Sequence, residues 1–355
     1  MLVPPQPDTQ EDETWSARTF DSALLEQVSL VRQTIPFGTI VHAPSKPDLN
    51  ETAPVVMVAG AFDGLHAGHR QLVQQALADA LANGMPCVAL TFDPDPAEVV
   101  SHEQSYGQRL LDIDDRIAGL LRLGIDYVMV LSFTHELAAY DPTRFVAEVL
   151  LSGTRPVSIH VGTNFRFGHQ GTGTVRTLQD AGASHGFVAC AHELLSSGSQ
   201  VISATSIRHL LARGELDQAN ALLCRCHYVR GTVVHGRGEA TSFGFPTANV
   251  RCDLKACLPA EGVYACYVLC DGSAWPAAAN VGAPPTFSQP EPAFLEANLL
   301  GFTGDLYGKS VSVSFVHWLR ASRVFDSLEE LERTVLDNIA WVDEHLGHER
   351  IEVRA

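Results

Sequence analysis

Up to residue 223, apolar and polar positions alternate in blocks that predict strands and helices in turn. Apolar runs long enough for buried strands are followed by stretches whose apolar residues recur at helical spacing. This alternation implies right-handed crossovers and an open, doubly wound parallel sheet, with ligands outside the carboxyl ends of its strands. The strand patterns cover residues 55–60, 87–92, 126–133 and 157–162, and the helix patterns cover residues 70–83, 112–123, 143–151 and 209–223.

Beyond residue 223 the pattern changes to short strands separated by turn residues, which predicts an antiparallel barrel or sandwich. In one strand Val311, Val313 and Phe315 alternate with serines, as in a half-buried strand. Ser327 and Glu330 form a capping-box pattern that begins a terminal helix. The strand patterns lie at residues 227–236, 263–270, 277–282, 294–300 and 310–318.

These patterns divide the chain into an extension and two domains. Residues 1–50 are rich in proline and acidic residues around one amphipathic stretch, 20–31, and are expected to be partly ordered. The α/β domain is predicted at residues 51–218 and the β domain at residues 228–350, with a linker at 219–227.

Composition narrows the kind of protein and its partners. A chain of 355 residues accommodates two domains, and a formal charge of −17 argues against a general nucleic-acid binder. Positive charge toward phosphorylated substrates must then be local, and a divalent cation would supplement it. The chain has no apolar run long enough to span a bilayer, no signal-peptide pattern and no disulfide framework among its eight cysteines. The sequence therefore predicts a cytoplasmic protein without a membrane partner and leaves its oligomeric state open.

Residues 60–69, GAFDGLHAGH, stand where the first buried strand gives way to a helix. A helix N-terminus presents free backbone N–H groups and the positive end of its dipole, so such a turn can hold a phosphate. His66 and His69 lie there with Gly68 between them. One histidine near a turn is commonly structural, but two histidines at the carboxyl end of a buried strand favour a functional site.

The decapeptide resembles the HxGH signature of the nucleotidyltransferase superfamily, in the form typical of bacterial bifunctional riboflavin kinase/FAD synthetases. Alone, it leaves cytidylyltransferases and pantetheine-phosphate adenylyltransferases open. Residues 161–168, VGTNFRFG, resemble the VGxDFRFG segment of the riboflavin kinase/FAD synthetase family, and residues 202–208, ISATSIR, resemble its ISSTxIR loop. Hydroxyls beside an arginine at a helix start suit the β- and γ-phosphates of ATP, although serine and threonine also cap helices routinely.

A second motif lies in the β domain. Residues 244–249, GFPTAN, resemble the GFPTAN motif of riboflavin kinases, and Thr247 and Asn249 offer neutral oxygens suited to Mg²⁺ and phosphate. The alternative is a polar turn between two strands. Residues 294–299, FLEANL, resemble the LExxLL strand in which the family carries a general base, which would be Glu296.

The resemblance covers about residues 55–346 and implies an α/β nucleotidyltransferase domain followed by an antiparallel β-barrel kinase domain with a terminal helix. The barrel would phosphorylate riboflavin to FMN with ATP and Mg²⁺, and the α/β domain would transfer AMP from ATP to FMN, giving FAD. The implied catalytic residues are His66, His69 and Glu296. The implied nucleotide ligands of the transferase site are Gly60, Phe62, Asp63, Gly68, Asn164, Ser203, Thr205 and Arg208, and its flavin ligands are Asp95, Phe165 and Arg166. The kinase site would use Gly244, Phe245, Pro246, Thr247 and Asn249, the last two also as Mg²⁺ ligands.

Several positions depart from the family pattern. Asp95 replaces a histidine and Ala204 a serine in the transferase half, while residues 240–241, residues 283–284 and Gly301 differ in the kinase half. These departures keep two alternatives open. One is a monofunctional FMN adenylyltransferase with a degenerate or flavin-analogue-specific kinase domain. The other is a non-catalytic flavin-binding regulator, which would have no need of a general base.

Overall fold

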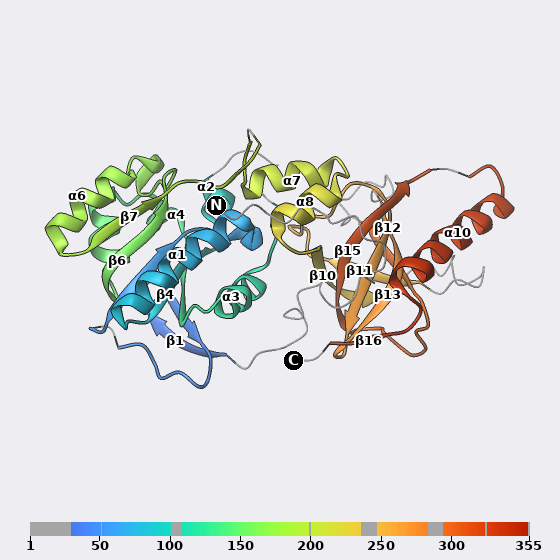
Figure 1. The fold of residues 1–355 in the computed structure, drawn as a ribbon, viewed down its shortest axis with the longest axis horizontal. Coiled ribbons are helices and arrows are strands. Elements are labelled where there is room, and N and C mark those ends of the chain that lie inside the picture. The colour runs from blue at the N-terminus through green and yellow to red at the C-terminus, as the bar shows by residue number, and fades with distance from the viewer. Residues whose placement is uncertain are drawn as a thin grey trace. The chain divides into compact units, whose positions relative to one another are not determined.

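The computed structural model of the chain describes residues 30–50, 52–100, 108–198, 200–235, 247–282, 294–323 and 325–353. The chain divides into two compact units (Figure 1). The first contains the described residues up to Cys224 together with Leu254–Cys257, and the second contains the remainder from Arg225. Leu254–Cys257, which the sequence places in the β domain, belongs to the first unit because its backbone pairs with Arg109. Arg109 N donates to Lys255 O at 2.6 Å, and Cys257 N donates to Arg109 O at 2.9 Å.

A seven-stranded sheet forms the centre of the first unit, in the order β1-β2-β5-β4-β3-β6-β7. Strands β3 to β7 run parallel, as the sequence predicts. The strand order reverses between β3 and β6, which places the topological switch point, and hence the expected ligand crevice, at their carboxyl ends. The strands are β1 Val31–Ile35, β2 Gly38–His42, β3 Pro54–Ala59, β4 Cys87–Asp93, β5 Tyr127–Ser132, β6 Arg155–Gly162 and β7 Val188–His192.

The first two strands come from the predicted extension. β2 pairs antiparallel with β5 along its whole length, and β1 pairs with β2. A Cβ at Gly38 would lie 2.0 Å from Val130 O, so the close approach of the two backbones requires glycine. The first unit therefore begins before residue 51. Residues 1–29, with most of the amphipathic stretch 20–31, lie outside the described residues.

Helices cover both faces of the sheet. α1 contacts β3, β4 and β6, and α3 contacts β5. On the other face Phe145, Val149 and Leu178 pack in one core cluster with Met57 and Leu90. The helices are α1 Ala67–Asn83, α2 Pro96–Val100, α3 Ile113–Arg122, α4 His135–Ala138, α5 Pro142–Phe145 with a π-helical continuation Val146–Leu150, α6 Val175–His185, α7 Ala204–Ala212 and α8 Leu216–Leu223. α8 therefore occupies much of the stretch predicted as a linker.

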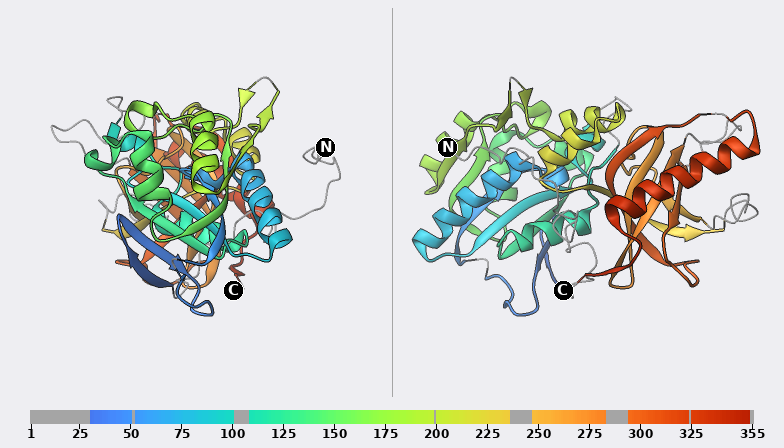
Figure 2. Two further views of the ribbon diagram at one scale, coloured as in Figure 1. Left: turned by 90° about the vertical axis from the view of Figure 1, so that its left-hand side faces the viewer. Right: turned by 45° about the vertical axis from the view of Figure 1, so that its right-hand side comes forward.

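Six strands close into an antiparallel barrel in the second unit. Their order is β12-β15-β10-β11-β14-β13, and pairing of β13 with β12 completes the ring. α10 packs against β12 and β13, and Figure 2 shows it along the outside of the barrel. The elements are β10 His227–Val234, β11 Ala248–Cys252, β12 Gly262–Cys270, β13 Ser273–Gly282, β14 Phe294–Leu299, β15 Ser310–Ala321, α10 Leu328–Leu346 and β16 Ile351–Glu352.

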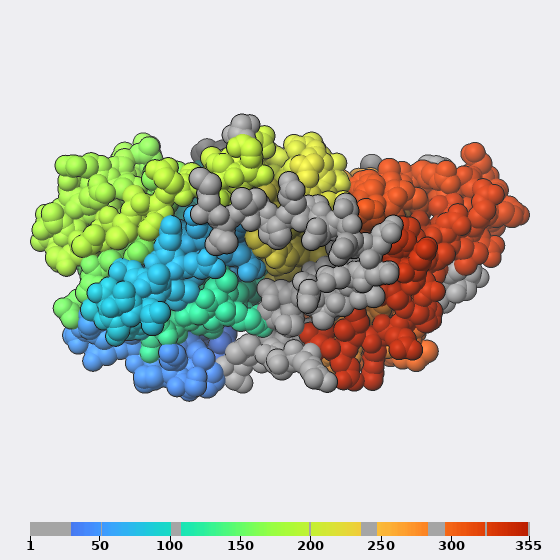
Figure 3. Space-filling model, viewed as in Figure 1, coloured from blue at the N-terminus to red at the C-terminus, as the bar shows by residue number. Residues whose placement is uncertain are grey.

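The terminal helix begins and ends at the predicted residues. Ser327 Oγ accepts a hydrogen bond from Glu330 N at 3.2 Å, whereas the Glu330 carboxylate accepts from Asp326 N, so only half of the capping box forms. The helix ends at Gly347. On the face drawn in Figure 3, α10 (red) and α1 (blue) both lie at the surface. Within the described ranges, every helix is too short or too polar to span a bilayer.

The serines of β15 show that the prediction of a half-buried strand is wrong. Ser312 and Ser314 are 3% and 0% exposed, as buried as the apolar residues that alternate with them. Ser314 lies between Tyr228 and Tyr267 in the strand register, and Tyr267 Oη donates to a carbonyl at the end of α10. Tyrosines and α10 therefore cover this face of β15. The serines alternate with larger apolar residues because small side chains fit beneath that cover, not because they contact water.

We expect Ser314→Ala to leave the free energy of unfolding of the second unit unchanged or to raise it by up to about 1 kcal/mol. Among the described residues, Ser314 Oγ has no hydrogen-bond partner, so the variant removes only a desolvated hydroxyl. Urea unfolding followed by tryptophan fluorescence measures the effect, because Trp275, Trp318 and Trp341 all lie in the second unit. Ser314→Val, which adds a methyl group to a packed site, should destabilise it. If Ser314→Ala lowered the free energy of unfolding by more than about 1 kcal/mol, the value of about one hydrogen bond, this account would be contradicted.

Candidate active sites

A cavity of about 410 Å³ opens at the carboxyl ends of β3 and β6, where the strand order reverses. Gly60 follows β3 and Gly162 ends β6, so at both positions the backbone itself borders the cavity. Segments far apart in the sequence bring most of the predicted transferase residues together here. Those that line the cavity are Gly60, Asp63, His66, Gly68, His69, Asp95, Asn164, Phe165, Arg166, Ser203, Thr205 and Arg208.

The turn between β3 and α1 presents the two histidines. His66 is the N-cap of α1, and its Nδ1 accepts a hydrogen bond from His69 N at 3.4 Å. The two imidazoles stack with their centroids 3.7 Å apart. A Cβ at Gly68 would lie 3.3 Å from the His66 ring, so a larger residue there would press on it. The free N–H groups and dipole of α1 favour an anion at this turn.

Burial keeps both imidazoles neutral near pH 7. It lowers the pKa of His66 to about 4, and burial together with the charges of His66 and Arg116 lowers the pKa of His69 well below its usual value. Because His66 Nδ1 accepts a hydrogen bond, the neutral ring carries its hydrogen on Nε2. Phe62, predicted as a nucleotide ligand, is fully buried and packs edge-on against His69 with centroids 5.3 Å apart. Phe62 therefore supports His69 from the core and does not line the cavity.

The low pKa of His66 predicts a loss of stability in acid. In the unfolded chain His66 is protonated below about pH 6.5, whereas in the folded protein it is protonated only below about pH 4. The free energy of unfolding therefore falls as the pH drops from about 6.5 to about 4. At about pH 5 the loss from His66 is about 2 kcal/mol. His66→Asn, which retains an N-cap side chain, should remove this contribution. Urea unfolding of both proteins at about pH 7.5 and about pH 5, followed by circular dichroism, measures it; an identical pH dependence would refute the assignment.

Asp63 and Arg208 form a buried ion pair beside the histidines. Arg208 Nη1 donates to Asp63 Oδ2 at 2.7 Å. The same carboxylate accepts hydrogen bonds from Leu110 N at 2.9 Å and from Leu111 N at 3.0 Å. Asp63 lines the cavity, as its predicted contact with the nucleotide requires, and that contact stays a prediction. Asp63 holds Arg208 at the cavity wall.

The start of α7 combines a helix cap with a polar surface of the cavity. Ser203 is the N-cap, and its Oγ accepts from Ser206 N at 3.1 Å. In the first turn, Arg208 Nη2 donates to Thr205 Oγ1 at 3.4 Å. Hydroxyl groups, a guanidinium and a helix N-terminus therefore face the cavity together, as a phosphate chain requires.

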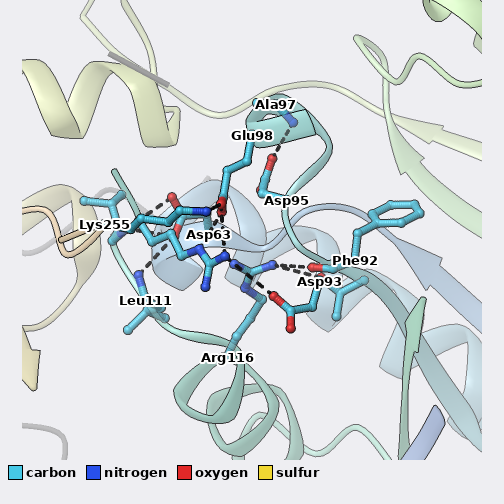
Figure 4. Close-up of polar contacts among 12 residues, drawn as sticks. Asp63, Phe92, Asp93, Asp95, Ala97, Glu98, Leu111, Arg116 and Lys255 are labelled. Atoms are coloured by element: carbon cyan, nitrogen blue, oxygen red, sulfur yellow. Dashed lines mark hydrogen bonds and ion pairs between the residues drawn. The ribbon is translucent and has the colours of Figure 1, made fainter. Parts of the chain in front are cut away.

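Arg116 is a site-supporting residue that the sequence analysis missed (Figure 4). It is 2% exposed and donates to Phe92 O at 3.1 Å and to Thr91 Oγ1 at 3.4 Å. Burial raises the pKa of Asp63, and the positive charges of Arg116 and Arg208 oppose that shift. The available signal was an arginine on the buried face of the predicted helix 112–123.

Glu98 anchors a second group of charges at the cavity wall (Figure 4). Its carboxylate, 4% exposed, accepts from Arg109 Nη2 at 2.9 Å and from Lys255 Nζ at 2.7 Å. Glu98 and Arg109 line the cavity. Because Lys255 lies 157 residues beyond Glu98, no local sequence pattern indicates this cluster.

An apolar cavity of about 430 Å³ adjoins the first and shares Phe92, Pro96, Phe165 and Arg166 with it. Further aromatic rings of its wall are Phe133, Phe145 and Phe167. Asp95, one of the predicted flavin ligands, accepts from Ala97 N at 2.9 Å and so shapes the start of α2. The cavity has the aromatic lining that suits a planar heterocycle.

The second unit contains a cavity of about 460 Å³ between the barrel and α10. Thr247 and Glu296 line it, and the strand register places Glu296 opposite Asn249 on one side and Asn280 on the other. Opposite residues of neighbouring strands share a face, so amide side chains flank the carboxylate. Arg320, Arg323 and Phe325, which the sequence analysis missed, also line the cavity. Gly244, Phe245 and Pro246 lie outside the described residues.

A doubly wound domain with a histidine turn at its switch point, followed by a closed barrel with a cavity lined by Thr247 and Glu296, defines a two-domain nucleotide-dependent transferase. The family model for FAD synthetase matches residues 48–206, and the model for riboflavin kinase matches residues 223–346. The chain belongs to the bifunctional riboflavin kinase/FMN adenylyltransferase family. Both domains of flavin biosynthesis are present, which confirms the predicted family and fold class.

Known relatives align over most of their length. The bifunctional riboflavin kinase/FMN adenylyltransferase of Pseudomonas fluorescens is 34% identical over 285 residues, 80% of this chain and 91% of the relative. The protein of the same name from Bacillus subtilis is 30% identical over 288 residues, 80% of this chain and 90% of the relative. A crystal structure described as a macrolide-efflux protein from Streptococcus pneumoniae has a TM-score of 0.74 at 26% identity, covering 82% of this chain and 99% of that one.

Proposed function

We propose that the cavity beside His66 and His69 transfers AMP from ATP to FMN. A phosphate oxygen of FMN attacks the α-phosphorus of ATP, and the bond from that phosphorus to the oxygen that bridges to the β-phosphate breaks, which releases pyrophosphate. The observation that carries this proposal is the pair of buried imidazoles at the N-terminus of α1, at the switch point of the sheet. Neutral rings donate N–H hydrogen bonds to the charge that develops on the phosphoryl oxygens.

The remaining residues of this cavity position the reactants. Arg208, held by Asp63, and Thr205 bind the departing pyrophosphate. The aromatic cavity that shares Phe165 and Arg166 takes the flavin ring. Because it shares wall residues with the cavity that the histidines line, a flavin held there would present its phosphate to that cavity.

The cavity of the second unit is proposed to phosphorylate riboflavin. Glu296 accepts the proton of the terminal ribityl hydroxyl as its oxygen attacks the γ-phosphorus of ATP, and ADP leaves. Thr247 and Asn249 fit Mg²⁺, because they offer hard, neutral oxygens beside a carboxylate. The bound ion would neutralise phosphate charge.

A chromatographic time course tests both activities. Purified protein receives riboflavin, ATP and Mg²⁺ in one series, and FMN in place of riboflavin in the other. Appearance of FMN and then FAD supports the proposal. FAD from FMN with riboflavin untouched would instead support a monofunctional adenylyltransferase, and faster turnover of a ring-modified flavin would support an analogue-specific kinase. No product in either series would favour a flavin-binding regulator.

We further propose that the enzyme works in the cytoplasm on small molecules alone. All eight cysteines are free, as expected where thiols are kept reduced. The formal charge of −17 disfavours nucleic-acid binding. Fractionation of cells that produce the protein tests the location, and recovery with the membrane fraction would contradict it.

A further inference from the structure

Three polar side chains outside the phosphate-binding machinery form a hydrogen-bonded chain that ends at the transferase cavity, with a buried His160 at its centre. His160 Nε2 lies 3.0 Å from Asp79 Oδ2, and His160 Nδ1 lies 2.9 Å from His192 Nε2. The two imidazoles lie nearly parallel, with an interplanar angle of 10° and centroids 5.0 Å apart, as in-plane hydrogen bonding requires. His160 is 4% exposed, whereas His192 lines the cavity. Leaving a polar atom of the buried His160 unpaired would be costly, so the hydrogen-bond directions at its two ring nitrogens are well defined.

Asp79 fixes those directions. Hydrogen bonds from Ser158 Oγ at 2.5 Å and from His160 lower the pKa of Asp79, so the carboxylate is ionised and only accepts. His160 must then donate from Nε2, which leaves Nδ1 as an acceptor for His192 Nε2–H. Burial and His160 lower the pKa of His192, which keeps that ring neutral. The remaining ring nitrogen of His192, Nδ1, is therefore a hydrogen-bond acceptor.

The position of His192 relates it to the nucleobase and not to the phosphates. The phosphate end of the cavity is the first turn of α1, at Gly68, whereas Asp79 lies three turns further along the same helix. Gln75, about 10 Å along the helix axis from Gly68 at 1.5 Å per residue, still lines the cavity. His192 lines the cavity and is joined through His160 to Asp79, on this distal part of the helix.

The wall beside His192 also suits a flat group. A Cβ at Gly162, the strand neighbour of His192, would lie 3.0 Å from both Leu194 Cδ2 and Asn164 Oδ1. Glycine therefore keeps the wall next to the imidazole free of a side chain, between Leu194 and the amide oxygen of Asn164. An adenine ring that lies against this wall presents a 6-amino group, which is a donor and matches an acceptor, whereas a 6-oxo purine presents an acceptor.

We propose that His192 Nδ1 accepts a hydrogen bond from the 6-amino group of ATP and selects adenine over 6-oxo purines, with His160 and Asp79 as positioning residues. This inference rests on the proposed adenylyl transfer in the same cavity. A neutral hydrogen bond of this kind corresponds to a preference of about three- to tenfold in kcat/KM.

The test measures FAD formation from FMN with ATP, with purine riboside triphosphate, which lacks the 6-amino group, and with ITP. His192→Leu should lower kcat/KM for ATP by about three- to tenfold and leave purine riboside triphosphate within about twofold. Asp79→Asn retains His192 but no longer fixes which ring nitrogens of His160 and His192 donate and which accept. The ratio of ITP to ATP turnover should therefore rise. His185→Leu, on the exposed last turn of α6, is the matched control and should change neither ratio.

The outcomes distinguish a failure of this inference from a failure of the proposed adenylyl transfer. An equal loss for all three nucleotides in His192→Leu would mean that the histidine chain is only structural and would overturn the inference. An unchanged ITP to ATP ratio in Asp79→Asn would overturn the role given to the carboxylate, and this variant remains informative if the leucine variant is unstable, because the Asp79 side chain is 31% exposed. If the unmodified protein makes no FAD from FMN and ATP, the proposed function itself fails.

Discussion

His69→Asn is expected to lower the rate of FAD formation from FMN and ATP by about 10²- to 10³-fold, the usual cost of removing one preorganised donor from a transition state. His69 packs edge-on against Phe62 and stacks on His66, so its ring is held before the substrate arrives. Asparagine keeps a polar side chain but lacks the reach of the imidazole. Steady-state FAD production at saturating ATP and FMN is the measurement.

The kinase reaction provides the internal control for His69→Asn. Phosphorylation of riboflavin to FMN should proceed at the unmodified rate, because Glu296 and the barrel cavity belong to the other unit. Adenylyl transfer within about threefold of the parent rate would show that His69 acts only in packing, since a factor of that size is below about 1 kcal/mol.

Glu296→Gln is expected to lower phosphorylation of riboflavin by about 10²- to 10⁴-fold, the range for loss of a general base. The amide is isosteric and should keep the strand pairing with Asn249 and Asn280, so the change removes only the proton acceptor. Single-turnover conversion of riboflavin to FMN measures the chemical step. FAD formation from added FMN should be unaffected.

Glu332→Gln is the matched variant, because it removes a carboxylate from the same cavity on the side of α10 and not of the barrel. We expect it to alter riboflavin binding modestly while the chemical step persists. Equal losses in the two variants would indicate that the cavity needs negative charge in general and would contradict the assignment of Glu296 as the base.

The sequence by itself determined the class of each domain and the segments that carry its chemistry. Hydrophobic periodicity is a local property, so buried strands and helices such as β3 and α1 could be placed from it. The histidine turn was identifiable because its residues are contiguous and because the end of a strand before a helix is a known place for anions. The same holds for the hydroxyls and arginine at the start of α7.

What only the tertiary structure decided depends on contacts between distant residues. The pairing of β2 with β5 drew residues 31–42 into the sheet, and backbone pairing with Arg109 placed Leu254–Cys257 in the first unit. Burial of Ser314 depended on tyrosines of the neighbouring strands and on a helix that packs on one of those strands.

The roles of single side chains within the transferase cavity were decided in the same way. Asp63 positions Arg208 and Phe62 supports His69, because the fold supplies each with a partner far along the chain or across the core. The chain from Asp79 through His160 to His192 joins a helix and two strands that no local pattern connects. Local propensity acts over a few residues, whereas burial and hydrogen-bond partners are set by the packing of the whole domain, and the function of a polar side chain follows from that packing.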